Sequence, residues 1–103
     1  MLFRSIEVEV IDPRTVAPLD VETIIRSVAK TGRLLIVDED FAHCGVSAEI
    51  AAQLADLGFD ELDAPIRRLN GTASPTPYSP TLEAAMVPNT ETIAQAIRDL
   101  CAE

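Results

Sequence analysis

Three neighbouring carboxylates are the first residues of this chain that could bind a ligand. Asp38, Glu39 and Asp40 directly follow an apolar run that is typical of a buried strand. Open α/β sheets bind ligands at the ends of their strands, and magnesium prefers carboxylate and water oxygens, so one interpretation is a magnesium site. We favour the alternative, a strand end whose charges face water, because nothing else in the chain completes a recognised metal motif.

His43 and Cys44 are adjacent, and they could be a nucleophile with its base or half of a zinc site. Side chains of adjacent residues rarely face each other. Zinc needs three or four protein ligands, whereas the chain has one histidine and only one further cysteine, Cys101. We therefore expect an ordinary loop before a helix, and two reduced thiols instead of a disulfide.

Arg67 and Arg68 lie on a short predicted strand, where their side chains alternate between the two faces. They could clamp an anionic substrate, but we favour two surface charges that pair with acids. The sequence has no G-x-G-x-x-G, no P-loop, no C-x-x-C and no nucleophile elbow. The residues taken singly therefore identify no active site.

The composition limits the class of protein and of partner. The chain has 103 residues, and we interpret residues 1–103 as a single partial domain with no second one. The net charge of −9 disfavours nucleic acid and anionic membranes, and it favours a basic protein partner. The apolar runs are too short to span a membrane and the first residues lack a signal-peptide pattern, so we expect a cytoplasmic protein.

Hydrophobic periodicity predicts strands that alternate with helices. Strands are expected at residues 6–11, 34–37 and 65–69. Helices are expected from the N-cap Asp20 to Gly32, from Gly45 to Gly58, from Pro80 to Met86, and from Pro88-Asn89 to Cys101. The apolar stripe of the second helix consists of Val46, Ile50, Leu54 and Leu57. This order predicts an α/β fold with three α/β/α layers around a mainly parallel sheet.

Several motifs, in this order along the chain, resemble those of one family. Residues 10–20 (VIDPRTVAPLD) resemble VIDLRTLxPLD, and residues 27–33 (SVAKTGR) resemble SVxKTGR. Glu39-Asp40 with residues 45–51 (GVSAEIA) resembles EDxxxGGxGAEIA, while residues 62–68 (LDAPIRR) and 75–80 (PTPYSP) resemble LDAPxxRV and PxPYSP. Over about residues 6–100 the chain thus resembles the C-terminal domain of the beta subunit of thiamin-diphosphate-dependent 2-oxoacid dehydrogenases. This family includes pyruvate, 2-oxoisovalerate and acetoin enzymes, and transketolase carries a related domain.

The resemblance implies a role in assembly and docking. In the family, thiamin diphosphate and Mg lie between the alpha subunit and the N-terminal part of the beta subunit, so this chain is expected to bind no cofactor and to be inactive alone. The whole complex decarboxylates a 2-oxoacid oxidatively and passes the acyl group to lipoamide. The implied partners are the alpha subunit, the N-terminal part of the beta subunit and the subunit-binding domain of the acyltransferase component. The other interpretation of the sequence is a stand-alone α/β interaction or regulatory module without enzymatic activity.

The site residues that the resemblance implies are docking residues, with no catalytic, cofactor-binding or metal-binding residue among them. Asp63, in the LDAP motif, matches a family position that contacts the basic subunit-binding domain of the acyltransferase. Glu103, at the C-terminal end, is expected near the same surface. The alternative for Asp63 is an ordinary turn residue ahead of a proline.

The chain departs from the family pattern in three ways. Cys44 replaces a glycine, which affects backbone freedom at a helix start, and Ala73 replaces an aspartate. The resemblance also implies a domain truncated at its N-terminal strands, with a strand missing between residues 6–11 and residues 34–37. We therefore expect either a homo-oligomer that fills the gap or strands that close up on each other.

Overall fold

The computed structural model describes residues 6–71 and 79–102 of the chain. Along the sequence it contains α1 (Val21–Thr31), β1 (Leu35–Val37), α2 (Val46–Leu57), the 3-10 turn η1 (Phe59–Glu61), β2 (Arg67–Leu69), α3 (Pro80–Met86) and α4 (Thr90–Cys101). Most of the proline-rich motif at residues 75–80 lies outside the described residues, as do Ala73 and Glu103.

Both ends of α1 are fixed by the capping groups that the sequence predicts. The Asp20 carboxylate accepts hydrogen bonds from the backbone N–H of Thr23 at 3.3 Å and from its hydroxyl at 2.6 Å. At the other end Gly32 has a left-handed φ of 75°, and its N–H donates to the Val28 carbonyl at 2.6 Å. Lys30 lies in the last turn, where a positive charge interacts favourably with the helix dipole. The predicted caps of this helix are confirmed.

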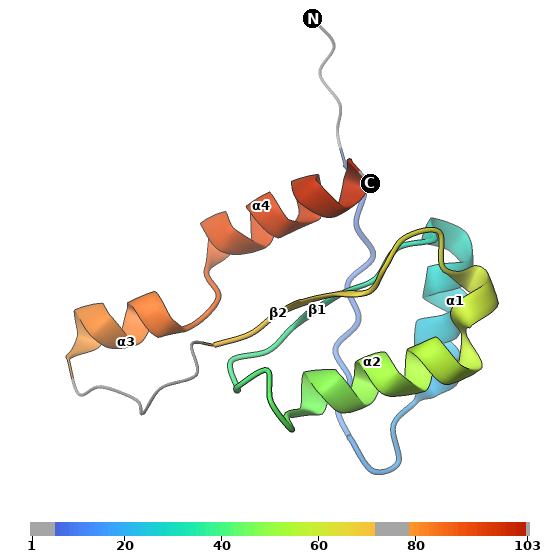
Figure 1. The fold of residues 1–103 in the computed structure, drawn as a ribbon, viewed down its shortest axis with the longest axis horizontal. Helices are drawn as coiled ribbons and strands as arrows, with labels where there is room; N and C mark the ends of the chain where they lie inside the picture. Colours follow the sequence, from blue (N-terminus) through green and yellow to red (C-terminus); the bar gives the residue numbers. More distant parts are fainter. Residues whose placement is uncertain (1–5, 72–78, 103) are drawn as a thin grey trace, which may run out of the picture.

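β1 and β2 form a parallel two-stranded sheet, in which Leu35 is level with Arg67 and Val37 with Leu69. Figure 1 shows α1 and α2 on one side of these strands and α4 on the other. The α/β fold class with three layers is therefore confirmed, in a form that has few strands.

The main core lies between the sheet and the helices α1 and α2. Ile24 and Val28 of α1, Ile36 of β1, and Ile50 and Leu54 of α2 form one buried cluster. Leu54 is completely buried, so its side chain contacts only protein. The centre of the fold thus depends on contacts among three elements that are far apart in the sequence.

The apolar stripe predicted for α2 is buried only in its middle. Ile50 and Leu54 are buried, whereas Val46 is 38% exposed and Leu57 is 61% exposed. The two exposed residues lie at opposite ends of the helix, beyond the part that a two-stranded sheet and α1 cover. The prediction that all four residues face the core is therefore wrong for the two ends.

Residues 6–11 do not form the predicted strand. No ladder joins them to β1, and Val10 is 84% exposed. Only Ile11, at the end of the segment, packs against the core. The alternation of apolar and acidic residues would give a strand one apolar and one polar face, but a strand also needs a neighbouring strand for its backbone hydrogen bonds. The expectation that the remaining strands close up is wrong for the same reason, because the sheet among the described residues has two strands.

The first of the last two helices begins at its predicted residue, and α4 begins at Thr90, directly after the predicted start at Pro88-Asn89. Pro80 is the first residue of α3, and Ser79 occupies the N-cap position without a side-chain hydrogen bond. At the start of α4, Asn89 and Thr92 form a reciprocal capping box, with both bonds at 2.9 Å. Within the two described ranges, no helix is long and apolar enough to cross a membrane.

Candidate docking surface

Asp63 lies in the turn that leads towards β2, and it is exposed. Its backbone N–H donates to the carbonyl oxygen of Gly32 at 2.7 Å, which ties this turn to the end of α1. Its carboxylate lies against the Gly32 backbone, in the space that a Cβ at position 32 would need. Asp63 therefore acts as a turn residue, and it also presents a carboxylate on the surface.

The exposed segment between the end of α2 and the turn at Asp63 combines acids with apolar side chains. We call it the acidic docking surface, and it consists of Leu57, Phe59, Asp60, Glu61 and Asp63. Phe59 is 69% exposed, and the neighbouring acids are exposed as well. Exposed large apolar side chains beside several charges of one sign are typical of a surface that binds a partner of the opposite charge. This arrangement suits a basic protein segment that also makes apolar contacts.

The sequence patterns do not predict the apolar part of this surface. The helical period places Leu57 in the core stripe, and it does not include Phe59. A signal was present, because Phe59 stands between Gly58 and two acids, outside the helical period. Glu103, the second predicted docking residue, lies outside the described residues and stays a prediction.

The acidic cluster after β1 is used to form a turn. Asp38 Oδ1 accepts a hydrogen bond from the backbone N–H of Asp40 at 3.1 Å, and Asp40 Oδ1 accepts one from the N–H of Phe41 at 2.7 Å. Among residues 6–71 and 79–102, no three His, Cys, Asp or Glu residues form a group that could hold a metal ion. In the structure, Asp38 and Asp40 of this cluster therefore serve the turn that follows β1.

The loop before α2 contains His43 and Cys44, and both are exposed, as expected for an ordinary loop. Cys44 has a φ of 57°, a left-handed conformation that favours glycine. Cys44 therefore has a backbone conformation that suits glycine, which is the residue that the family pattern has at this position. Cys44 and Cys101 are both free thiols, as predicted.

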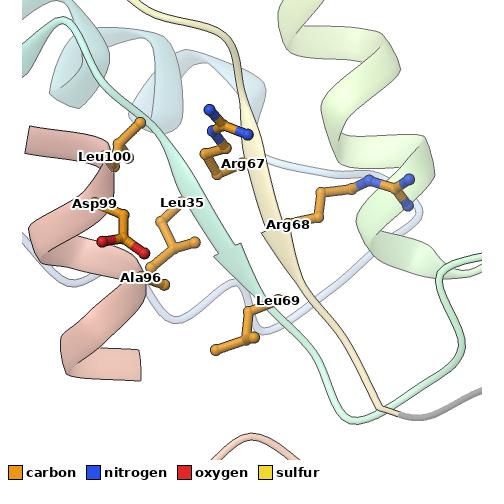
Figure 2. A pocket seen from close by; sticks show the side chains of 7 residues that line it. All are labelled: Leu35, Arg67, Arg68, Leu69, Ala96, Asp99 and Leu100. Atoms are coloured by element: carbon orange, nitrogen blue, oxygen red, sulfur yellow. The ribbon is translucent and has the colours of Figure 1, made fainter. Parts of the chain in front are cut away.

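Arg67 and Arg68 point to opposite faces of the sheet, as predicted. Arg68 Nη1 donates to the carbonyl oxygen of Ala42 at 2.9 Å, which ties the loop before α2 to β2. The prediction that Arg68 pairs with an acid is therefore wrong. On the other face, Arg67 lines a shallow hollow between the sheet and α4, with Asp99 and Leu100 on the helix side (Figure 2). Arg67 and Arg68 both contribute to the lining of this hollow, together with the carboxylate of Asp99, so it is not lined by cations alone.

Known proteins match this chain over nearly its whole length. A family model described as "Transketolase, C-terminal domain" matches residues 3–93. The acetoin:2,6-dichlorophenolindophenol oxidoreductase subunit beta of Bacillus subtilis (strain 168) is 45% identical over 100 residues, which are 97% of this chain and 29% of that subunit.

Two further relatives have similar names. The pyruvate dehydrogenase E1 component subunit beta of Rhizobium meliloti (strain 1021) is 42% identical over 98 residues, which are 95% of this chain and 21% of the relative. The mitochondrial pyruvate dehydrogenase E1 component subunit beta of Saccharomyces cerevisiae (strain ATCC 204508 / S288c) is 45% identical over 97 residues, which are 93% of this chain and 26% of the relative. The chain thus spans less than a third of the length of these curated relatives.

Proposed function

Because this chain belongs to the transketolase C-terminal domain family, we propose that it is the assembly and docking domain of a 2-oxoacid dehydrogenase beta subunit. The observation that carries the proposal is the 45% identity over 97% of the chain to a beta subunit of an oxidoreductase. The acidic docking surface supports it, since a domain that binds other subunits needs an exposed, charged and partly apolar surface.

The proposal assigns no chemical step to this chain. The described residues form no metal-binding group, and the sequence has no phosphate-binding loop. In the whole enzyme, thiamin diphosphate with magnesium would supply the decarboxylation chemistry from other regions, and the acyl group would pass to lipoamide. Incubating the chain with thiamin diphosphate, magnesium and pyruvate should give no turnover. Turnover without a second subunit would contradict the proposal.

The proposed partners are the alpha subunit, the N-terminal part of the beta subunit and the basic subunit-binding domain of the acyltransferase component. In this arrangement Asp63 contacts the basic domain, and Leu57 and Phe59 add apolar contact. The net charge of −9 favours approach of a basic partner.

We also propose that the chain functions in the cytoplasm, which its two free cysteines support because thiols stay reduced there.

The docking role is tested by binding of a recombinant acyltransferase subunit-binding domain to the chain at low salt. Asp63→Ala should weaken the affinity several-fold, because it removes a charge that faces the basic partner. Glu91→Ala removes the same charge from an exposed position on α4 and should change the affinity little. Equal affinities of the Asp63→Ala variant and the native chain would exclude Asp63 from the docking site.

A further inference from the structure

The junction between α1 and β1 holds two other parts of the fold through consecutive residues. The carbonyl oxygen of Gly32 accepts a hydrogen bond from the Asp63 backbone N–H at 2.7 Å. Nε of Arg33 donates to the carbonyl oxygen of Leu100, in the last turn of α4, at 3.2 Å. Because Gly32 and Arg33 are adjacent, the turn at Asp63 and the end of α4 both lie at the end of the sheet where β1 begins.

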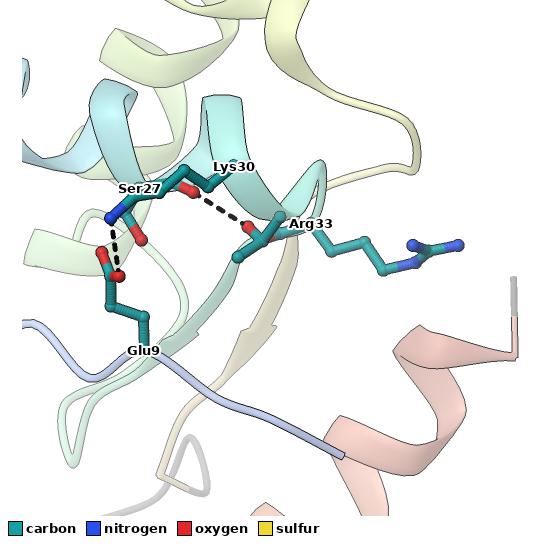
Figure 3. Close-up of polar contacts among 5 residues, drawn as sticks. Glu9, Ser27, Lys30 and Arg33 are labelled. Atoms are coloured by element: carbon teal, nitrogen blue, oxygen red, sulfur yellow. Dashed lines mark hydrogen bonds and ion pairs between the residues drawn. The ribbon is translucent and has the colours of Figure 1, made fainter. Parts of the chain in front are cut away.

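Arg33 extends towards α4, whereas the other cation at the end of α1 is paired elsewhere. Lys30 Nζ lies 2.9 Å from Glu9 Oε2, and Figure 3 shows the Arg33 side chain extending away from both residues. The last carbonyl oxygens of a helix have no partner within the helix and carry partial negative charge, so a guanidinium suits them. Arg33 thus caps the C-terminal end of α4 from outside that helix.

The end of α4 is fixed by Leu100 and by this contact with Arg33. Leu100 is 5% exposed and is the buried residue of α4, whereas Asp99 and Cys101 on either side of it are exposed. Asp99 lines the hollow of Figure 2 together with Leu35, the first residue of β1. The Asp99 carboxylate therefore also lies at the end of the sheet where β1 begins.

We infer that Arg33 is a positioning residue of the docking site. By holding the end of α4 where β1 begins, Arg33 places the Asp99 carboxylate at the same end of the sheet as Asp63, so that one basic partner contacts both acids. The inference rests on the proposed docking function and extends the docking site from the acidic docking surface to a second element. The role of Arg33 is geometric, since its own charge opposes the approach of a basic partner.

A spin label tests the placement of α4 without any partner. Cys101 is exposed at the end of α4, so it can carry a nitroxide once Cys44→Ser has removed the other free thiol. The label should broaden the NMR signal of the Asp63 amide. Arg33→Met removes every side-chain donor and should lose most of this broadening, whereas Arg33→Lys keeps a donor and the charge and should retain it. Equal broadening with and without the Arg33→Met substitution would overturn the positioning role.

Binding of the recombinant acyltransferase subunit-binding domain at low salt tests the docking part. Arg33→Met makes the chain more negative than −9, so charge alone predicts tighter binding of a basic partner. Positioning predicts the opposite, an affinity at least about threefold weaker, with Arg33→Lys close to the native chain. Unchanged or tighter binding by Arg33→Met would overturn the docking part.

Arg98→Met is the matched control, because it removes the same charge from an exposed residue of α4 whose guanidinium binds Gln95 within the helix. It should not weaken binding, and weakening equal to that of Arg33→Met would contradict a specific role for Arg33. A native chain that does not bind the domain would contradict the proposed function and the docking part with it, while the spin label still decides the placement of α4.

Discussion

The backbone N–H of Asp63 donates to the carbonyl oxygen of Gly32 at 2.7 Å, and the Asp63 carboxylate occupies the space beside the Gly32 Cα. Gly32 is required there for two reasons, a left-handed φ of 75° and the lack of room for a side chain. The end of α1 and the candidate docking residue are therefore packed against each other as one unit.

Gly32→Ala should destabilise the chain by about 1–3 kcal/mol, because alanine is strained at this φ and its Cβ overlaps the Asp63 carboxylate. Urea unfolding measures the free-energy change. In the double variant with Asp63→Ala the overlap is largely removed, so its cost should be smaller than the sum of the two single costs. Additive costs would show that the carboxylate does not crowd position 32.

Cys44→Gly should stabilise the chain by about 1 kcal/mol, since glycine adopts the left-handed φ of 57° without strain. Cys44→Ala is the matched control, because it removes the thiol but keeps the Cβ that causes the strain. It should give no comparable gain in the free energy of unfolding. Equal gains from the two variants would attribute the effect to the thiol.

Two leucines of α2 should respond differently to truncation. Leu54→Ala should cost about 3 kcal/mol of unfolding free energy, because the side chain is completely buried in the main core. Leu57→Ala should change stability by no more than about 0.5 kcal/mol, because this side chain is largely exposed. A large cost at Leu57 would mean that the helix end is covered in solution.

Hydrogen bonds from the Thr23 side chain and backbone lower the pKa of Asp20 from its ordinary value of 3.8. Because the folded pKa is below the unfolded one, the cap contributes stability above pH 3.8 and loses it as the pH falls through the folded pKa. Thr23→Val removes the larger cause, so it should raise the pKa of Asp20 and reduce the loss of stability on acidification. Carbon-detected NMR titration of the Asp20 carboxyl checks this, and an unchanged pKa would exclude the hydroxyl as the main cause.

The helices, their ends and the family can be predicted from local patterns in the sequence. Asp20, Gly32, Gly45 and Pro80 act through neighbours a few residues away, so their effects can be read from local sequence. The ordered motifs identified the family for a similar reason, because they depend only on residue types and spacing. A local pattern, an aspartate shortly before a proline, also predicts the alternative that Asp63 is a turn residue.

Features that depend on residues far apart in the chain become visible only in the folded arrangement. Residues 6–11 have a strand pattern but no strand, because a ladder exists only where a second backbone lies alongside. Leu57 and Val46 have core-type side chains yet are exposed, because burial depends on how far the sheet and α1 extend. The contact between Gly32 and Asp63 joins residues that are far apart in the chain, and only the folded arrangement of α1 and the turn before β2 brings them together.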